Sequence, residues 1–198
     1  AGDDHVSKSS TIPHQSEISF YNYALPTLTP GNTQEVLDFG LWGIALSRYT
    51  GAWTGIKVST DICDGGGTVE LSPERVPTVE PEFEIDGERY EKVMNPLLII
   101  PISLRLEREL HYRRIAAAKE FARTNGFNQV RVRHDGDHLG IVTTGKSYYD
   151  LMSAFRNVGM GADELAAAGI RILKLGMVFP LEPTIIEEFV DGLGRVLV

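Results

Sequence analysis

Segments typical of strands and helices alternate along this 198-residue chain. In the first half, a short β-type run over residues 24–29 turns at residues 30–32 into a helix over residues 33–49, and a strand over residues 53–60 follows. A strand, a helix and a second strand form a βαβ unit, which implies a parallel sheet with a right-handed crossover. This pattern predicts an α/β fold.

The last third of the chain repeats the alternation. A long amphipathic helix is expected over residues 103–124, and it leads into a second unit. In that unit we expect strands over 139–144, 170–175 and 195–198, and helices over 146–158, 162–168 and 184–193. The final expected strand stops within an apolar run, without a following turn, so we expect this chain to be a segment of a longer polypeptide. The architecture predicted is two α/β units with parallel sheets.

An acidic stretch separates the two units. Residues 65–96 hold eight acidic side chains, and prolines at positions 73, 77 and 81 disfavour a regular helix there. We interpret this stretch as a surface excursion or linker and not as core. The predicted domains are therefore residues 1–72, a linker over 73–102, and residues 103–198.

Composition excludes several classes of protein. The chain has 27 acidic and 19 basic residues, a net charge of −8, which disfavours binding to nucleic acid or anionic membranes. Its longest apolar runs are far too short to span a bilayer, and no leader is visible. The single Cys63 excludes an internal disulfide and a cysteine-based cluster, and it suits a reducing compartment such as the cytoplasm.

Residues 140–147 match the phosphate-loop pattern G-x-x-x-x-G-K-[ST]. That loop must wrap a phosphate with its backbone amides, yet the four middle residues are β-formers and should belong to the strand. We therefore favour a tight strand-to-helix turn at Gly145-Lys146-Ser147, whose helix N-terminus could attract an anion. A nucleotide site is the alternative.

Three other stretches are rich in polar groups. Residues 134–138 contain two His and two Asp, which could bind a metal but are interpreted as a solvated loop. Residues 61–67, with three glycines, follow a predicted strand, where parallel sheets place ligands; a flexible turn is the alternative. The opening residues 3–17 are interpreted as a polar loop of the kind that lines sites.

These residues together resemble the pyrimidine-binding domain of the large indolepyruvate ferredoxin oxidoreductases, followed by a domain with a transketolase C-terminal-like fold. These enzymes are thiamine-diphosphate-dependent 2-oxoacid:ferredoxin oxidoreductases. The resemblance rests on residues 2–5, 8–11, 14–17, 34–40, 47–51 and 57–64 in the first half, and on 139–147, 168–171 and 174–183 in the second.

The resemblance implies oxidative decarboxylation of a 2-oxoacid, such as an aryl pyruvate, with thiamine diphosphate. Electrons would pass through iron–sulfur clusters to ferredoxin, and coenzyme A would take the acyl group. The Glu that activates thiamine, the magnesium site and the cluster cysteines are expected in other parts of the parent enzyme. This segment alone should therefore be inactive and bind none of these cofactors tightly, and the parent is expected to be a homo-oligomer.

The resemblance and the strand-end rule together assign the candidate site. The side chains expected nearest the substrate are His5, His14 and Gln15. Those expected on the cofactor side are Asp4, Asp61, Asp64 and Gly65; no metal ligand is assigned. The competing hypotheses are a phosphate-loop nucleotide binder and a non-catalytic interaction module of the same fold.

Overall fold

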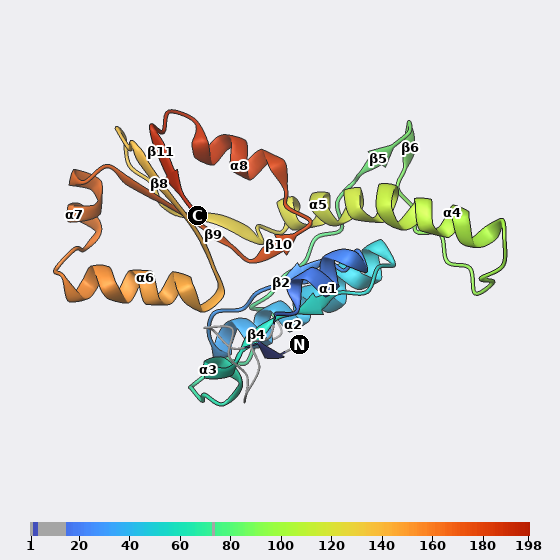
Figure 1. Ribbon diagram of the computed structural model, residues 1–198, viewed down its shortest axis with the longest axis horizontal. Coiled ribbons are helices and arrows are strands. Elements are labelled where there is room, and N and C mark those ends of the chain that lie inside the picture. Colours follow the sequence, from blue (N-terminus) through green and yellow to red (C-terminus); the bar gives the residue numbers. More distant parts are fainter. Residues whose placement is uncertain (1, 4–14, 73) are drawn as a thin grey trace.

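The computed structural model describes residues 2–3, 15–72 and 74–198, and it has the α/β architecture that the sequence predicts (Figure 1). Two larger sheets carry the fold, one of three strands and one of four. Two further strand pairs lie outside them: β1 (Gly2–Asp3) with β4 (Val58–Ser59), and β5 (Glu84–Ile85) with β6 (Glu88–Arg89).

The predicted βαβ unit is present in the first half of the chain. β2 (Thr27–Leu28) and β3 (Gly55–Ile56) pair in parallel across α2 (Thr33–Thr50). The helix begins where expected, because the Asn32 side chain accepts a hydrogen bond of 2.8 Å from the Glu35 backbone N–H. It ends at Gly51, whose φ of 71° suits a residue without a Cβ.

The prediction of one strand over residues 53–60 is wrong. The chain leaves the ladder with β2 after Ile56, and Val58 and Ser59 pair in parallel with Gly2 and Asp3 instead. A short helix, α3 (Thr60–Cys63), follows at once. Another short helix, α1 (Glu17–Asn22), precedes β2.

The second unit is a four-stranded sheet in the order β11-β8-β9-β7. The strands β8 (Leu139–Thr144), β9 (Ile170–Leu175) and β11 (Arg195–Leu197) are parallel, whereas β7 (Asn128–Val132), which the sequence analysis missed, is antiparallel to β9. Helix α8 (Pro183–Val190) lies on one side of this sheet, and α6 (Gly145–Asn157) and α7 (Ala162–Ala167) lie on the other (Figure 1).

The two sheets are joined by one continuous run of chain. β9 passes through Gly176 directly into β10 (Met177–Phe179), which pairs antiparallel with β2. A Cβ on Gly176 would lie 2.3 Å from the carbonyl oxygen of Phe127, so only glycine allows this close passage. A strand from the second half of the chain thus completes the sheet of the first half.

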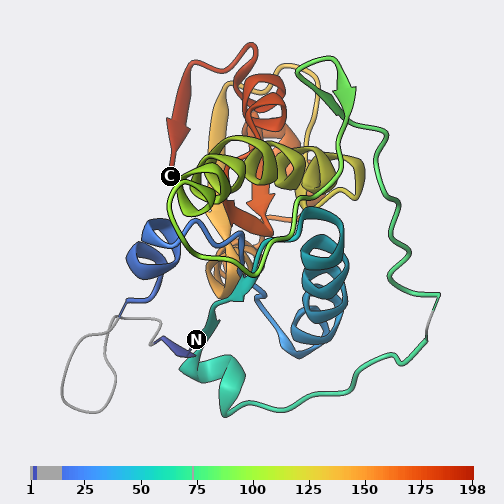
Figure 2. The same cartoon turned by 90° about the vertical axis from the view of Figure 1, so that its right-hand side faces the viewer.

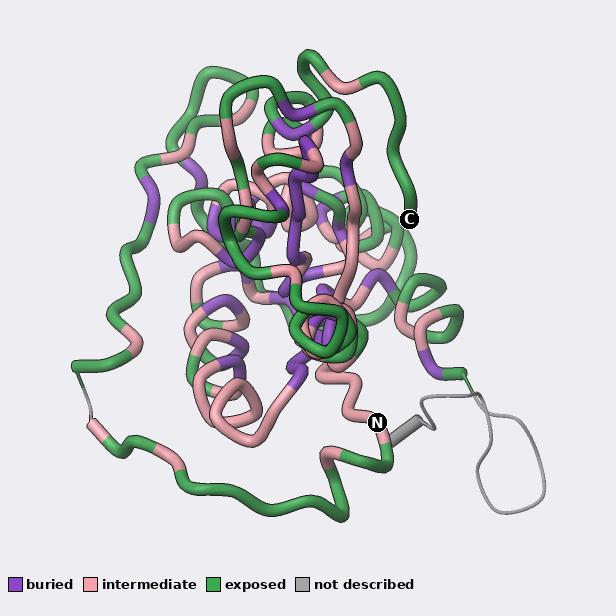
Figure 3. The backbone as a smooth tube through the Cα atoms, turned by 90° about the vertical axis from the view of Figure 1, so that its left-hand side faces the viewer, coloured by how far each residue is buried: buried purple, intermediate pink, exposed green. Residues whose placement is uncertain are grey.

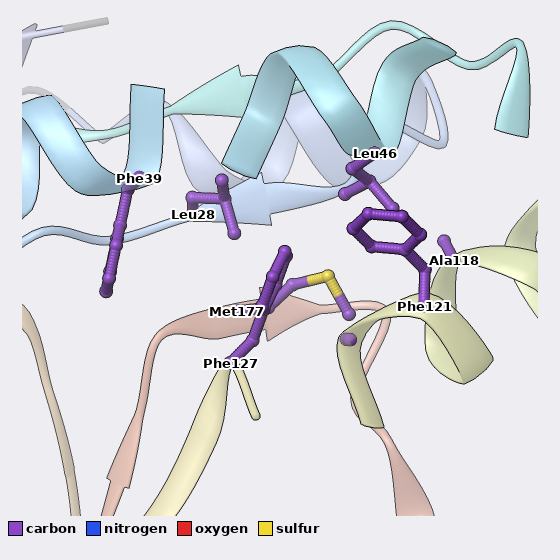
Figure 4. Close-up of a cluster of buried hydrophobic side chains, with 8 residues drawn as sticks. Leu28, Phe39, Leu46, Ala118, Phe121, Phe127 and Met177 are labelled. Atoms are coloured by element: carbon purple, nitrogen blue, oxygen red, sulfur yellow. The ribbon is translucent and has the colours of Figure 1, made fainter. Parts of the chain in front are cut away.

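One hydrophobic core spans both halves (Figure 4). Phe39 and Leu46 of α2 pack with Phe121 of the helix α5 (Ile115–Thr124) and with Met177 of β10, all of them buried. The ring of Trp42 is stacked between those of Phe39 and Phe127, with centroids 5.1 and 4.4 Å away. Burial of apolar area of this kind is the main force holding such units together.

The predicted long helix is present as one helical run. α4 (Ile102–Arg108) continues through a π-helical stretch (Glu109–Arg114) into α5. In the described part of the chain, no helix has the length and apolar character that crossing a bilayer would need.

Residues 65–96, which we call the strap, circle the outside of the molecule (Figure 2). Their described residues form no helix, as predicted, and most are exposed (Figure 3). The expectation that the strap contributes nothing to the core is wrong, however, since Pro81 and Tyr90 are buried. Tyr90 donates a 2.8 Å hydrogen bond to the backbone oxygen of Thr50 at the end of α2.

Candidate functional site

The strand ends of the two units abut. The loop after β2 meets the start of α6 so closely that a Cβ on Gly31 would lie 2.2 Å from the carbonyl oxygen of Gly145. Gly145 itself has a φ of +52°. We call this meeting of residues 29–32 with residues 144–146 the junction. Because ligands bind beyond the carboxyl ends of parallel strands, it is a place where both sheets can contribute to a site.

Three polar side chains cross the junction. Glu35 lies in the first turn of α2, Tyr149 on α6 and Lys174 near the end of β9. Lys174 Nζ forms an ion pair with Glu35 Oε1, to which the Tyr149 hydroxyl donates a hydrogen bond of 2.6 Å. The other carboxylate oxygen of Glu35 accepts the Gly31 backbone N–H at 2.8 Å. Glu35 therefore connects both units and the junction loop.

Of the two charged groups that cross the junction, the ammonium group of Lys174 is the more deeply buried. Its residue is 5% exposed, and Nζ lies 4.5 Å from the ring centroid of Tyr149 and 4.9 Å from that of Tyr148. Burial lowers the pKa of Lys174, and the hydrogen bond to Glu35 opposes this shift. Burial together with Glu35 raises the pKa of Tyr149, so that hydroxyl keeps its proton and remains a donor.

A cavity of about 470 Å³ lies beside the junction. Glu35, Tyr149 and Lys174 form one wall, β7 contributes Gln129 and Arg131, and the strap contributes Arg75. The strap is fastened here, because Arg75 binds Asp38 through two nitrogens and Glu70 at 2.7 Å. The cavity is thus enclosed by both units and by the strap.

The structure covers only some of the site residues predicted from sequence. Asp4, His5 and His14 lie outside the described residues. Gln15 is exposed just before α1. Asp61, Asp64 and Gly65 lie in or directly after α3, and all three are exposed.

One of these residues does reach the second unit. Lys146 Nζ lies 3.5 Å from Asp61 Oδ2, and it also binds both carboxylate oxygens of Asp150 at 2.7 and 2.8 Å. These carboxylates, Asp150 first, raise the pKa of Lys146. The pairing places residues 61–67 beside the junction.

The interpretation of residues 145–147 as a strand-to-helix turn is confirmed. β8 extends to Thr144 and is paired with β9 along its whole length, and α6 begins at Gly145. The amides that a phosphate loop would turn toward a phosphate are therefore part of a strand. With Lys146 held by Asp150 as well, the structure does not support a nucleotide site here.

The interpretation of residues 134–138 as a solvated loop is correct only in part. Asp137 is buried, accepts the His134 backbone N–H at 2.9 Å, and pairs with buried Arg171 at 3.2 Å. The carboxylate is buried because it neutralises this arginine. Within the described residues, no group of three His, Cys, Asp or Glu side chains could hold a metal ion.

Sequence reasoning missed Glu35, Tyr149 and Lys174 as members of a site. A signal was present in the run Ile170-Arg171-Ile172-Leu173-Lys174-Leu175, which places two cations in an otherwise apolar strand. A central parallel strand is buried on both faces, so each cation there requires a buried partner. Arg171 and Lys174 have such partners in Asp137 and Glu35.

Comparison with known proteins supports the resemblance drawn from the sequence. The family model described as "Indolepyruvate oxidoreductase domain" matches residues 129–198. Indolepyruvate oxidoreductase subunit IorA of Methanothermobacter thermautotrophicus is 28% identical over 196 residues, which cover 96% of this chain and 29% of that protein. The IorA subunit of Pyrococcus horikoshii is 26% identical over 176 residues, covering 88% of this chain and 25% of that protein. The chain thus spans between a quarter and a third of these relatives.

A solved structure shares the fold. The 2-oxoglutarate:ferredoxin oxidoreductase of Magnetococcus marinus, solved with 2-oxoglutarate, coenzyme A and succinyl-CoA bound, superposes with a TM-score of 0.53 at 11% identity. The match covers 98% of this chain and 40% of that one. The fold class expected from the sequence is therefore confirmed over both halves of the chain.

Proposed function

This chain is related to the IorA subunit of indolepyruvate oxidoreductase along 96% of its length, and we propose that it is a segment of an enzyme that oxidatively decarboxylates a 2-oxoacid. The substrate proposed is an aryl pyruvate such as indolepyruvate. The parent enzyme would use thiamine diphosphate and iron–sulfur clusters, transfer electrons to ferredoxin and transfer the acyl group to coenzyme A. The similarity carries this proposal because it runs in order through both α/β units.

The described residues that were predicted on the cofactor side, Asp61, Asp64 and Gly65, do not fit the diphosphate and magnesium of such a cofactor. A diphosphate requires cations or backbone amides, whereas the nearest predicted positions, Asp61 and Asp64, are exposed carboxylates. The described residues also offer no group of three metal ligands. We therefore place the diphosphate and the metal on other parts of the parent enzyme and assign no step of the reaction to this chain through them.

The role proposed for this segment is to build one wall of the active site. Residues 1–72 are assigned to the pyrimidine-binding-type domain and residues 103–198 to the transketolase C-terminal-like domain. The junction holds the strand ends of both in fixed register. The opening loop, with Asp4, His5, His14 and Gln15, and the loop with Asp61, Asp64 and Gly65 would face substrate and cofactor, with the histidines donating hydrogen bonds to a substrate carboxylate or enolate oxygen.

The test compares this chain with a longer polypeptide that contains it. Both are produced without oxygen, the longer one with its partner subunits, and 2-oxoacid-dependent reduction of a viologen dye is measured with thiamine diphosphate and coenzyme A. We expect activity only from the longer protein, highest with aryl pyruvates. His14→Ala should lower that activity at least about tenfold, whereas His111→Ala, an exposed site on the long helix, should not.

The outcomes separate the proposal from its alternative. A longer protein that folds, binds its cofactors and reduces no dye with any 2-oxoacid would contradict the enzyme assignment. That result would favour the interaction module of the same fold. Equal activity in the His14→Ala variant would instead remove only the proposed substrate contact.

The partners of the parent enzyme follow from the same proposal. Ferredoxins in such systems are acidic, and the strap between residues 80 and 91 is acidic too. Like charges repel, so we place the ferredoxin site elsewhere on a cytoplasmic, homo-oligomeric parent. Salt-sensitive binding of ferredoxin to this chain alone would argue against that placement.

A further inference from the structure

The cavity beside the junction is lined by three cations and two carboxylates, and a third carboxylate, Glu70, binds one of these cations from outside the lining. The charged side chains that line it are Arg75, Arg131 and Lys174 against Glu35 and Asp38. Arg75 is already held by Asp38 and by Glu70 of the strap. The remaining carboxylate of the lining, Glu35, forms its ion pair with Lys174.

Arg131 has a neutral partner. Its guanidinium donates to Gln129 Oε1 at 2.8 Å and lies 5.8 Å from the ring centroid of Tyr148. Among the described residues, no carboxylate lies within ion-pair distance of it. The positive charge of Arg131 also lowers the pKa of Lys174, so the two cations repel each other across the cavity.

The ring of Trp42 in the cavity lining is already engaged in stacking with two other rings. Trp42 lines the wall, but both faces of its ring are covered by Phe39 and Phe127. A ligand here would thus be held by charge and hydrogen bonds more than by stacking. The Tyr149 hydroxyl already donates its proton to Glu35, so the further donors of the lining are the side-chain amides of Asn32 and Gln129, which suit oxygen-rich ligands.

We propose that this cavity binds a small oxyanion, a carboxylate or a phosphate, between Arg131 and the ammonium group of Lys174. Charge-assisted hydrogen bonds from a guanidinium and an ammonium group are the strongest contacts that side chains offer to such anions. The ligand would relieve the repulsion between the two cations. None of the residues that line this site belongs to residues 61–67, and its binding of an anion is independent of the reaction proposed above.

The chain carries its own reporter for the test. It has two tryptophans, Trp42 in the cavity wall and Trp53, which is 83% exposed. Trp53→Phe leaves Trp42 as the sole reporter. In this background the full chain is titrated with inorganic phosphate, acetate and malonate at constant ionic strength while Trp42 fluorescence is recorded. The anion that binds tightest identifies phosphate or carboxylate as the ligand chemistry.

A matched pair of variants tests the assignment to Arg131. We expect Arg131→Gln to weaken binding at least about tenfold, because it removes one of the two cations that hold the anion. Arg131 and Arg133 are both exposed, but Arg133 lies outside the cavity lining. Arg133→Gln should therefore change the Kd less than about twofold.

Thermal stability gives a second measurement that does not depend on fluorescence. The bound anion should raise the Tm of the Arg133→Gln protein and not that of the Arg131→Gln protein. Absence of any response to all three anions at millimolar concentration would overturn the proposal. Equal weakening by both substitutions would overturn it too, because that result indicates diffuse attraction and no defined site.

Discussion

Glu35 is the side chain on which the junction depends most. It forms an ion pair with Lys174, and it accepts hydrogen bonds from the Tyr149 hydroxyl and the Gly31 backbone N–H. A buried charge lowers stability unless it is paired, so removal of one partner leaves the other as an uncompensated buried charge. The stabilising effect of Glu35 therefore includes the prevention of an unpaired ammonium group at Lys174.

Glu35→Gln should lower the free energy of unfolding by about 3 kcal/mol at pH 7. The double variant Glu35→Gln/Lys174→Met should recover most of this loss, since it leaves no buried charge. The pKa of Lys174 is lowered from its ordinary 10.5 in the folded state, so the unfolded state binds more protons there. The difference in free energy of unfolding between the parent and Glu35→Gln should accordingly shrink as the pH rises toward 10.5.

Urea unfolding between pH 7 and 10 measures these differences, with Glu187→Gln as the control. Glu187 is exposed on α8, and its substitution should stay within about 0.5 kcal/mol of the parent. If the double variant were less stable than Glu35→Gln alone, the interpretation of Lys174 as an unpaired buried cation would be wrong.

At the scale of elements, the strap is held to α2 at several points. Near the start of the helix, the Glu70 backbone N–H donates to Gln34 Oε1 at 2.7 Å. Near its end, the Tyr49 hydroxyl donates to the Pro81 oxygen at 3.3 Å and Tyr90 donates to Thr50. The strap is therefore part of the folded unit, although its sequence has the composition of a linker.

Tyr90→Phe should loosen this attachment by about 1 kcal/mol at pH 7, the usual contribution of one hydrogen bond. Burial raises the pKa of Tyr90 to about 12 from 10.0. Because the pKa of Tyr90 is higher in the folded state than in the unfolded state, its protonated hydroxyl contributes stability that is fully present below pH 10. That contribution is lost as the pH rises through 12. The variant should therefore lose stability less steeply than the parent between pH 10 and 12.

Stability measured across that pH range tests the attachment of the strap. Tyr23→Phe is the control, since Tyr23 lies outside the strap and is 65% exposed. It should leave the alkaline slope unchanged. An alkaline slope that also stays unchanged in Tyr90→Phe would show that Tyr90 does not anchor the strap.

The elements that sequence reasoning found are those with local signals. The Asn32 cap, the apolar spacing of α2 and the β-formers of β8 each lie within a short stretch of chain. The antiparallel pairing of β10 with β2 joins residues about 150 positions apart, and no local pattern encodes such a partner. The cluster of Glu35, Tyr149 and Lys174 was missed for the same reason, since its members meet only after both sheets have formed.

At the scale of the whole molecule, the two α/β units share one core. Phe121 is 1% exposed and packs with Tyr49 of α2 and with Phe127 before β7, their ring centroids 5.4 and 5.8 Å away. β10 adds a strand of the second half to the sheet of the first. Two units that share this core cluster and a sheet should unfold together, because the cluster is complete only when residues of both halves are present.

We therefore expect one cooperative unfolding transition for the chain. Hydrogen exchange followed by mass spectrometry should give the same free energy of opening for amides of α2 in one unit and of β8 and β9 in the other. Phe121→Ala should lower both by about 3 to 5 kcal/mol, the effect of emptying a large buried site.

Leu104→Ala is the matched control, because Leu104 lies on the same long helix and is 58% exposed. It should leave the exchange of both units unchanged. Protection of β8 and β9 that survived Phe121→Ala while α2 lost its own would mean that residues 103–198 fold independently. The proposed domains would then be separable folding units, and the shared core would only dock one against the other.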